Sequence, residues 1–151
     1  MGTCRRDCAV VKELYRYPVK KGAAVEETAL VLTAGEGISG DCHADGGERQ
    51  ISLLSVEEKT WMEQQEIKGF CFHKYKENIL LDGICLKECH PGDFLEIGTA
   101  VLEITGSGKS CHRELCKLAK TQKECRLAGG SLFASVKESG VIAKGMKVSR
   151  G

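Results

Sequence analysis

Residues 94–104 read FLEIGTAVLEI, two short runs rich in Leu, Ile and Val on either side of a glycine. Short apolar runs of this kind recur along the chain, whose 151 residues include 18 glycines and only two prolines. Such a pattern is typical of all-β barrels and sandwiches. We therefore expect a mainly β fold with strands over residues 8–14, 28–33, 49–54, 78–81, 94–97, 100–104, 133–137 and 147–149.

Helical patterns are few. The run Ser55-Val56-Glu57-Glu58 fits a capping box, and residues 56–66 lack glycine and proline, which predicts a helix over residues 55–66. A shorter helix is expected over residues 111–120. Two helices cannot cover both faces of a parallel sheet, so an α/β fold is not expected. Residues 138–141 have the composition of a turn between two closing strands.

Composition favours one domain over residues 1–151, because this length and an apolar content of 42% suffice for a single core. The 22 basic and 21 acidic residues leave a net charge of +1, so no overall field attracts nucleic acid. The apolar stretches near the N-terminus are too short for a signal peptide or a membrane span, and Arg6 does not fit a myristoylation motif. We expect a cytoplasmic protein that binds neither nucleic acid nor membrane.

The nine cysteines are expected to be reduced thiols, because their number is odd and no export signal is seen. Most of them, such as Cys71 and Cys85, are expected to act as small buried hydrophobes.

Two glycine-rich runs resemble nucleotide-binding motifs. Residues 35–40 satisfy G-x-G-x-x-G, but the loop-like composition of residues 41–47 predicts no helix to receive a phosphate. Residues 106–110 read GSGKS, yet the first glycine of a P-loop would fall at Glu103. We therefore expect neither a dinucleotide fold nor an NTPase, although a Gly/Ser turn beside Lys109 still makes a small anion site.

The residues around Cys111 favour a reactive thiol. Lys109 and Ser110 precede this cysteine, His112 and Arg113 follow it, and a short helix is expected to begin there. Positive charge and free backbone N–H groups raise the thiolate fraction of a cysteine. The alternative is an exposed but idle thiol.

A zinc site has weaker support. Soft ligands are available, but the chain contains no C-x-x-C and the spacings match no common structural zinc site. The residues concerned are Cys111, His112, Cys116 and Cys125.

A second polar cluster runs from Gly40, Asp41 and His43 to Arg49 and Gln50. Taken singly, Asp41 can be a turn residue, His43 a loop residue and Arg49 a charge at a strand edge.

A series of short motifs covers nearly the whole chain. They are Gly40-Asp41 with His43-Ala44, Arg49-Gln50-Ile51-Ser52-Leu53-Leu54-Ser55 with Glu57, Glu77-Asn78-Ile79, Pro91-Gly92-Asp93, Ile97-Gly98, Ala100-Val101-Leu102-Glu103-Ile104-Thr105, Gly108-Lys109 with Cys111-His112, Phe133-Ala134, Gly140 and Gly145. In their joint order these motifs resemble the MOSC domain, which is named for the C-terminal domain of molybdenum cofactor sulfurase.

The resemblance implies a β-barrel with a few short peripheral helices. It also implies that Cys111 is the functional thiol, which in related proteins carries sulfur as a persulfide or ligates molybdenum. Two departures from the family pattern are seen. The arginine often found before the Phe-Ala pair is absent, so that Arg126 is the nearest one, and Met146 stands where an Asp is usual.

We therefore expect the chain to bind molybdenum cofactor (molybdopterin) or its pterin precursor. Lys109, Arg49 and Arg126 are expected to supply positive charge for the phosphate. Hydrogen bonds are expected from Gln50, Asn78, Ser107 and Ser110, and the site is expected to include Asp41 and His43. A sulfur donor or a cofactor-biosynthesis protein is a further expected partner. The alternatives are a small molybdenum-dependent reductase of N-oxygenated compounds and a pterin-binding module without turnover.

Overall fold

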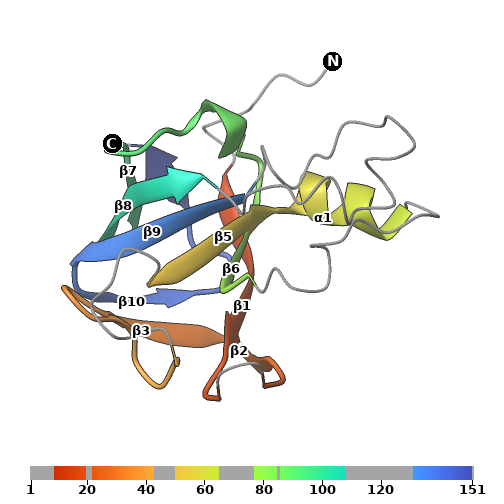
Figure 1. Cartoon of the computed structure of the whole chain (residues 1–151). Helices are drawn as coiled ribbons and strands as arrows, with labels where there is room; N and C mark the ends of the chain where they lie inside the picture. Colours follow the sequence, from red (N-terminus) through yellow and green to blue (C-terminus); the bar gives the residue numbers. More distant parts are fainter. Residues whose placement is uncertain are drawn as a thin grey trace, which may run out of the picture.

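The computed structural model describes residues 9–19, 22–42, 50–64, 77–84, 86–107 and 131–150. These residues form eleven strands, one α-helix and one short 3-10 helix, shown in Figure 1. In chain order the elements are β1 (Val10–Arg16), β2 (Val25–Glu27), β3 (Ala29–Thr33), β4 (Gly37–Ile38), β5 (Ile51–Ser55), α1 (Val56–Gln64), β6 (Ile79–Asp82), η2 (Leu86–Glu88), β7 (Phe94–Ile97), β8 (Ala100–Ser107), β9 (Ser131–Glu138), β10 (Gly140–Ala143) and β11 (Val148–Arg150).

The strands form two sheets. Eight of them follow the order β11-β7-β8-β9-β5-β6-β1-β2, and a smaller sheet has the order β10-β3-β4. Only the β5–β6 pair is parallel among these described strands, and the connection between its two strands contains α1. A parallel pair needs such a crossover, whereas antiparallel neighbours can follow each other through short turns. The fold is therefore mainly β with a mixed sheet, and no α/β winding is seen in the described residues.

A closed barrel was predicted, but the strand ladders of the described residues do not close into one. The edge strands of the large sheet, β11 and β2, do not pair with each other. The segment before β11 approaches β1 instead: Val10 of β1 forms an isolated β-bridge with Lys147, the residue before β11. The main-chain N–H groups of Val11 and Val148 donate to the carbonyls of Met146 and Ala9, each at 2.9 Å.

The eight predicted strands all have a counterpart, with ends displaced by at most three residues. The sequence analysis missed β2, β4 and β10, which are only two to four residues long. The predicted turn at residues 138–141 is correct in place, because Ser139 separates β9 from β10. Residues 35–42, which include the glycine motif, contain the short strand β4 and turns but no helix, and residues 43–49 lie outside the described residues.

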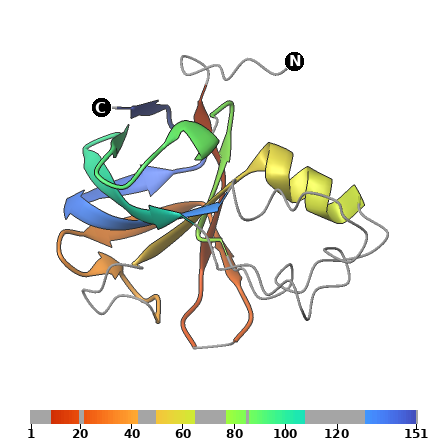
Figure 2. The same cartoon turned by 45° about the horizontal axis from the view of Figure 1, so that its top comes forward.

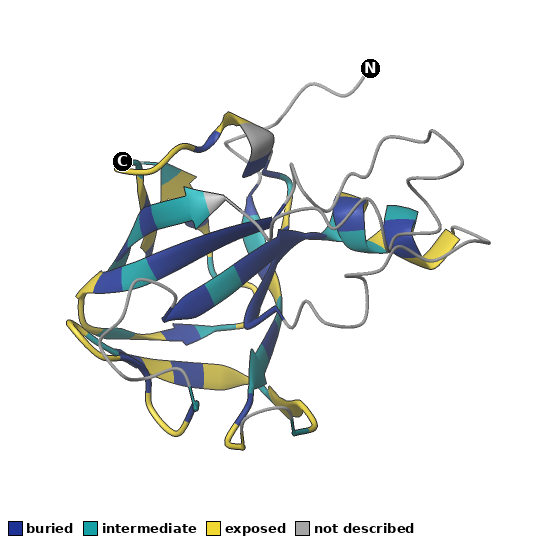
Figure 3. Cartoon of the chain, viewed as in Figure 1, coloured by how far each residue is buried: buried dark blue, intermediate teal, exposed yellow. Residues whose placement is uncertain are grey.

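The main core lies between the sheets and is formed by alternate residues of the strands. On β3, Leu30 and Leu32 are buried while Val31 is 52% exposed. A second cluster lies on the other face of β5, β6 and β9, where Leu54, Leu80 and Phe133 pack with α1; Met62 belongs to this cluster as well. Figures 2 and 3 show the helix at the side of the β-structure, and the colours of Figure 3 show buried residues along β5 and β9.

The helix begins as its capping signal predicts. The Ser55 hydroxyl donates to Glu58 Oε2 at 2.9 Å and accepts the Glu58 main-chain N–H at 3.3 Å. This contact satisfies one of the free N–H groups at the start of α1. The N-cap half of the predicted capping box is therefore confirmed, and α1 covers nine residues of the predicted helix. The predicted helix over 111–120 lies outside the described residues.

Candidate functional site

The predicted site residues divide into two groups. The structure describes the side chains of Asp41, Gln50 and Asn78, and it describes the backbone of Ser107 at the end of β8. The remaining predicted site residues lie outside the described residues. They are His43, Arg49, Lys109, Ser110, Cys111 and Arg126, together with the zinc candidates His112, Cys116 and Cys125.

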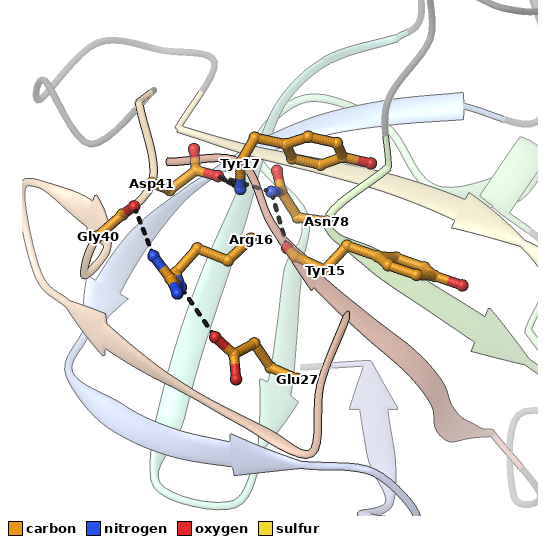
Figure 4. Close-up of polar contacts among 7 residues, drawn as sticks. All are labelled: Tyr15, Arg16, Tyr17, Glu27, Gly40, Asp41 and Asn78. Carbon is orange, nitrogen blue, oxygen red and sulfur yellow. Dashed lines mark hydrogen bonds and ion pairs between the residues drawn. The ribbon is translucent and has the colours of Figure 1, made fainter. Parts of the chain in front are cut away.

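Asn78 precedes β6 and is 1% exposed. Its Oδ1 accepts the Ser52 N–H at 2.9 Å, and its Nδ2 donates to the Tyr15 carbonyl and to Asp41 Oδ1, each at 3.2 Å (Figure 4). Its main chain extends the sheet on both sides, because the Asn78 N–H donates to the Ser52 carbonyl and the Asn78 carbonyl accepts the Tyr15 N–H, each at 2.8 Å. The side chain thus uses one acceptor atom and both amide hydrogens within the protein.

Asp41 follows a turn that needs glycine at position 40. Gly40 has a φ of +82°, and its carbonyl accepts a hydrogen bond from Arg16 Nη1 at 3.2 Å. Asp41 Oδ1 accepts the Tyr17 N–H at 2.8 Å, and the Cys42 N–H donates to the Tyr17 carbonyl at 2.8 Å. Asp41 therefore bonds to Tyr17, which directly follows β1 and lies 24 residues away in the sequence. It is more than a local turn residue.

Gln50, immediately before β5, is 3% exposed, and its Oε1 accepts the Val136 N–H of β9 at 3.0 Å. Met146, the second departure from the family pattern, lies against the main core, and its Sδ accepts the Ala143 N–H at 3.0 Å. Each of these two side chains thus accepts a hydrogen bond from a main-chain N–H of the protein.

A cluster around Glu77 was not found from the sequence. Lys59 Nζ of α1 lies 2.6 Å from Glu77 Oε2 and 5.1 Å from the centroid of the Tyr15 ring. The Tyr17 hydroxyl donates to the Glu77 carbonyl at 2.9 Å. Glu77 belonged to a recognised motif, but no motif pointed to Lys59 or Tyr17, whose partners are distant in the sequence.

Charge and burial act on the pKa of Lys59 in opposite directions and on the pKa of Tyr17 in the same direction. Burial favours the neutral form of Lys59, but the hydrogen bond and charge of Glu77 outweigh it, so the pKa of Lys59 is raised. Burial raises the pKa of Tyr17, and the charges of Glu77 and Asp41 add to this effect. Tyr17 therefore remains a neutral hydrogen-bond donor at physiological pH.

The strand register places the flanks of the Cys111 segment. Ser107, the last residue of β8, pairs with Leu132, and Ser131 of β9 pairs with Leu54 of β5. The chain thus leaves β8 and re-enters β9 near the end of β5 where α1 begins, as Figure 1 shows. Gln50 lies just before the other end of β5, about 13 Å from Leu54 at about 3.3 Å per residue. The segments that carry Arg49 and Cys111 therefore join the sheet at opposite ends of β5.

Cys42 and Cys89 are not in a disulfide, and Cys89 is buried as the sequence predicts for most cysteines. Within the described parts of the chain, no three His, Cys, Asp or Glu residues are grouped so that they could hold a metal ion. No helix there is long and apolar enough to span a membrane. Proposals for metal or thiol chemistry therefore concern the segment around Cys111.

Solved structures with the same fold include the YuaD protein from Bacillus subtilis. It is 19% identical to this chain with a TM-score of 0.70, and the match covers 93% of each chain. YiiM from Geobacillus stearothermophilus is 17% identical with a TM-score of 0.62, and the match covers 95% of this chain and 75% of that one. YiiM from Escherichia coli is 18% identical with a TM-score of 0.59, at 95% and 68% coverage.

No curated protein matches the chain. A family model does match, and it covers residues 40–149 under the description MOSC domain. This range exceeds half of the sequence and includes the polar cluster at Asp41 as well as Cys111. The chain therefore belongs to the MOSC domain family.

Proposed function

We propose that the chain is a single domain that binds molybdenum cofactor or its pterin precursor, with Cys111 as molybdenum ligand or persulfide sulfur carrier. The family match over residues 40–149 carries this proposal, because the family is associated with this cofactor. The donor set fits the group: a thiolate is a soft ligand for a metal and a nucleophile toward a sulfur donor. Lys109, Arg49 and Arg126 provide cations for a phosphate.

The described residues show where the two candidate segments join the sheet. The segments carrying Arg49 and Cys111 join opposite ends of β5, about 13 Å apart along the strand. In this proposal the phosphate of the pterin cofactor is bound by basic residues from both segments. When bound, the group would supply a redox-active metal. Cys111 would hold that metal or accept sulfur, while the basic residues would orient the phosphate.

Barrel closure and a cytosolic location belong to the same proposal. Three main-chain hydrogen bonds link residues 145–148 to Ala9 and Val11, which supports a barrel closed between β1 and β11. That Cys42 and Cys89 are not in a disulfide is compatible with a reducing compartment.

The test is cofactor loading. The protein is purified from a host that produces molybdenum cofactor, and molybdenum and pterin are measured per folded protein. We expect both in the parent protein, and we expect Cys111→Ser to lose molybdenum or transferable sulfur while Cys116→Ser keeps them. A parent protein that carries neither molybdenum nor pterin, or a Cys111→Ser variant with full loading, would contradict the proposal. If the parent is loaded, electron transfer to an N-hydroxylated compound separates the reductase from the carrier.

A further inference from the structure

Two carboxamide side chains are buried among the described residues, Gln50 with 3% and Asn78 with 1% exposure. Asn78 uses its acceptor atom and both amide hydrogens in hydrogen bonds within the protein. Gln50 differs, because only its Oε1 is bonded, to the Val136 N–H at 3.0 Å. In the described part of the chain, Gln50 Nε2 has no hydrogen-bond partner, although it is not sealed from solvent. Since buried polar groups are normally paired, these two N–H hydrogens indicate a ligand at this position.

Two serines lie beside Gln50 on one face of the β5–β9 ladder, whose strands run side by side in Figure 1. Ser52 follows Gln50 by two residues. Ser135 faces position 50, because Ile51 pairs with Ala134 and each strand continues by one residue. Both serines are partly exposed, and neither hydroxyl has a hydrogen-bond partner among the described residues. Neighbours on such a ladder have Cβ atoms within about 8 Å of each other, so one ligand can reach all three groups.

The surroundings of these groups carry no net charge in the described residues. On one side Phe133, which pairs with Ser52, packs in the apolar cluster beside α1. On the other side Glu103, which pairs with Ser135, forms an ion pair with Lys137 at 2.9 Å. A phosphate would need an unpaired cation here, whereas neutral donors beside an apolar cluster suit an uncharged ring with hydrogen-bonding atoms on its edge.

We propose that Gln50, Ser52 and Ser135 bind the pterin ring system of the ligand. The inference rests on the proposed function for the identity of that ligand, and it gives Gln50 a role apart from the phosphate. Gln50 Nε2 donates to a carbonyl or ring nitrogen of the pterin, while the two hydroxyls donate or accept along the same edge. Ser52 lies within β5, between the strand ends at which the segments carrying Arg49 and Cys111 join the sheet.

The test uses unsubstituted pterin, which carries no phosphate. The full chain is purified from a host that does not make the cofactor and is titrated with pterin, whose fluorescence reports binding. We expect Ser52→Ala and Ser135→Ala each to weaken binding about two- to tenfold, the scale of one neutral hydrogen bond. Gln50→Glu keeps an acceptor for the Val136 N–H but replaces both donor hydrogens by an acceptor oxygen, so we expect a loss of about tenfold or more.

The controls separate ligand binding from folding and from phosphate binding. Ser149→Ala changes an exposed serine on β11, at the far edge of the large sheet, and should keep parental affinity. Ser52→Ala and Ser135→Ala should keep the parental midpoint of urea unfolding, because their hydroxyls have no partner in the described chain. Excess inorganic phosphate should not displace the pterin.

The outcomes distinguish this inference from the proposed function. Parental pterin affinity in both serine variants, or displacement of pterin by inorganic phosphate, would overturn the inference, and the serine variants decide it even if Gln50→Glu does not fold. A parent that is loaded with cofactor in a producing host but does not bind free pterin would overturn it as well. A parent without molybdenum or pterin from that host refutes the proposed function, while pterin binding that the serine variants weaken would still support the ring site.

Discussion

Replacing Lys59 by methionine tests how the helix is tied to the start of β6. The Lys59–Glu77 pair has its charged atoms 2.6 Å apart, with side-chain exposures of 32% and 10%. Exposed ion pairs contribute about 0–1 kcal/mol, whereas breaking a fully buried pair costs about 3–5 kcal/mol. This pair lies between those limits, because water screens the lysine while the carboxylate is largely desolvated. We therefore expect Lys59→Met to lower the free energy of unfolding by about 1–3 kcal/mol.

A double-mutant cycle in urea separates the contributions. Glu77→Gln removes the carboxylate, so adding Lys59→Met to it leaves no unpaired buried charge and should cost less than Lys59→Met alone. We expect a coupling energy of about 1–2 kcal/mol, within the range for contacting residues. In the Glu77→Gln background, Lys59→Met still loses the contact of Lys59 with the Tyr15 ring, which contributes about 0.5–1 kcal/mol. Coupling close to zero would refute the reasoning.

The pH dependence gives an independent check. The pKa of Lys59 is raised in the folded protein, so its contribution is complete below the unfolded value of about 10.4 and disappears as pH rises through the folded value. The difference in unfolding free energy between the parent and Lys59→Met should therefore be constant from about pH 7 to 9 and shrink above about pH 10.4. A difference that instead shrinks between pH 7 and 9 would contradict this assignment.

Three further predictions concern the start of β10, the cap of α1 and the thiol of Cys111. In Gly140→Ala the new Cβ would lie 2.8 Å from the main-chain nitrogen of the buried Ala100, so we expect a loss of about 1–3 kcal/mol in urea unfolding; parental stability would show that β10 gives way. Ser55→Ala removes the cap of α1 and should cost about 0.5–2 kcal/mol, with reduced helical circular dichroism; an unchanged unfolding curve would argue against the cap. Cys111 should react with a thiol reagent at neutral pH faster than any other cysteine, and Cys111→Ser should shift stability by no more than about 0.5 kcal/mol; a faster Cys116 would displace the proposed site.

Local sequence signals predicted the elements whose contacts are local. The helix start was predictable because Ser55 and Glu58 are three residues apart and bond to each other. The longer strands were predictable because their apolar runs fill the core in alternation. In contrast, β10 begins at Gly140 inside a predicted turn, and it is a strand because Val141 pairs with Val31, 110 residues earlier. No pattern among neighbouring residues predicts a pairing with a strand so far away in the sequence.

The candidate site shows the same division. Cys111 and its basic neighbours could be selected from the sequence, because the electrostatics of a thiol depend on residues beside it in the chain. The polar cluster around Asp41 was also found, but the expected roles were those of ligand contacts. The roles of Asp41 and Asn78 follow from contacts across 37 residues, which place one carboxylate oxygen against a main-chain N–H and a buried carboxamide at once.

The sequence by itself determined that the chain is mainly β, that a helix starts after Ser55, and that its motif order is that of the MOSC family. These properties depend on composition, on short-range periodicity and on residue identity, which need no coordinates. Only the tertiary structure decided the strand order, the parallel β5–β6 pair and the connection of Asp41, Asn78 and Ser52. Strand partners and buried polar contacts are chosen by the packing of the whole chain, because each N–H and each carboxylate has many acceptable local partners and only the assembled core leaves one of them in reach.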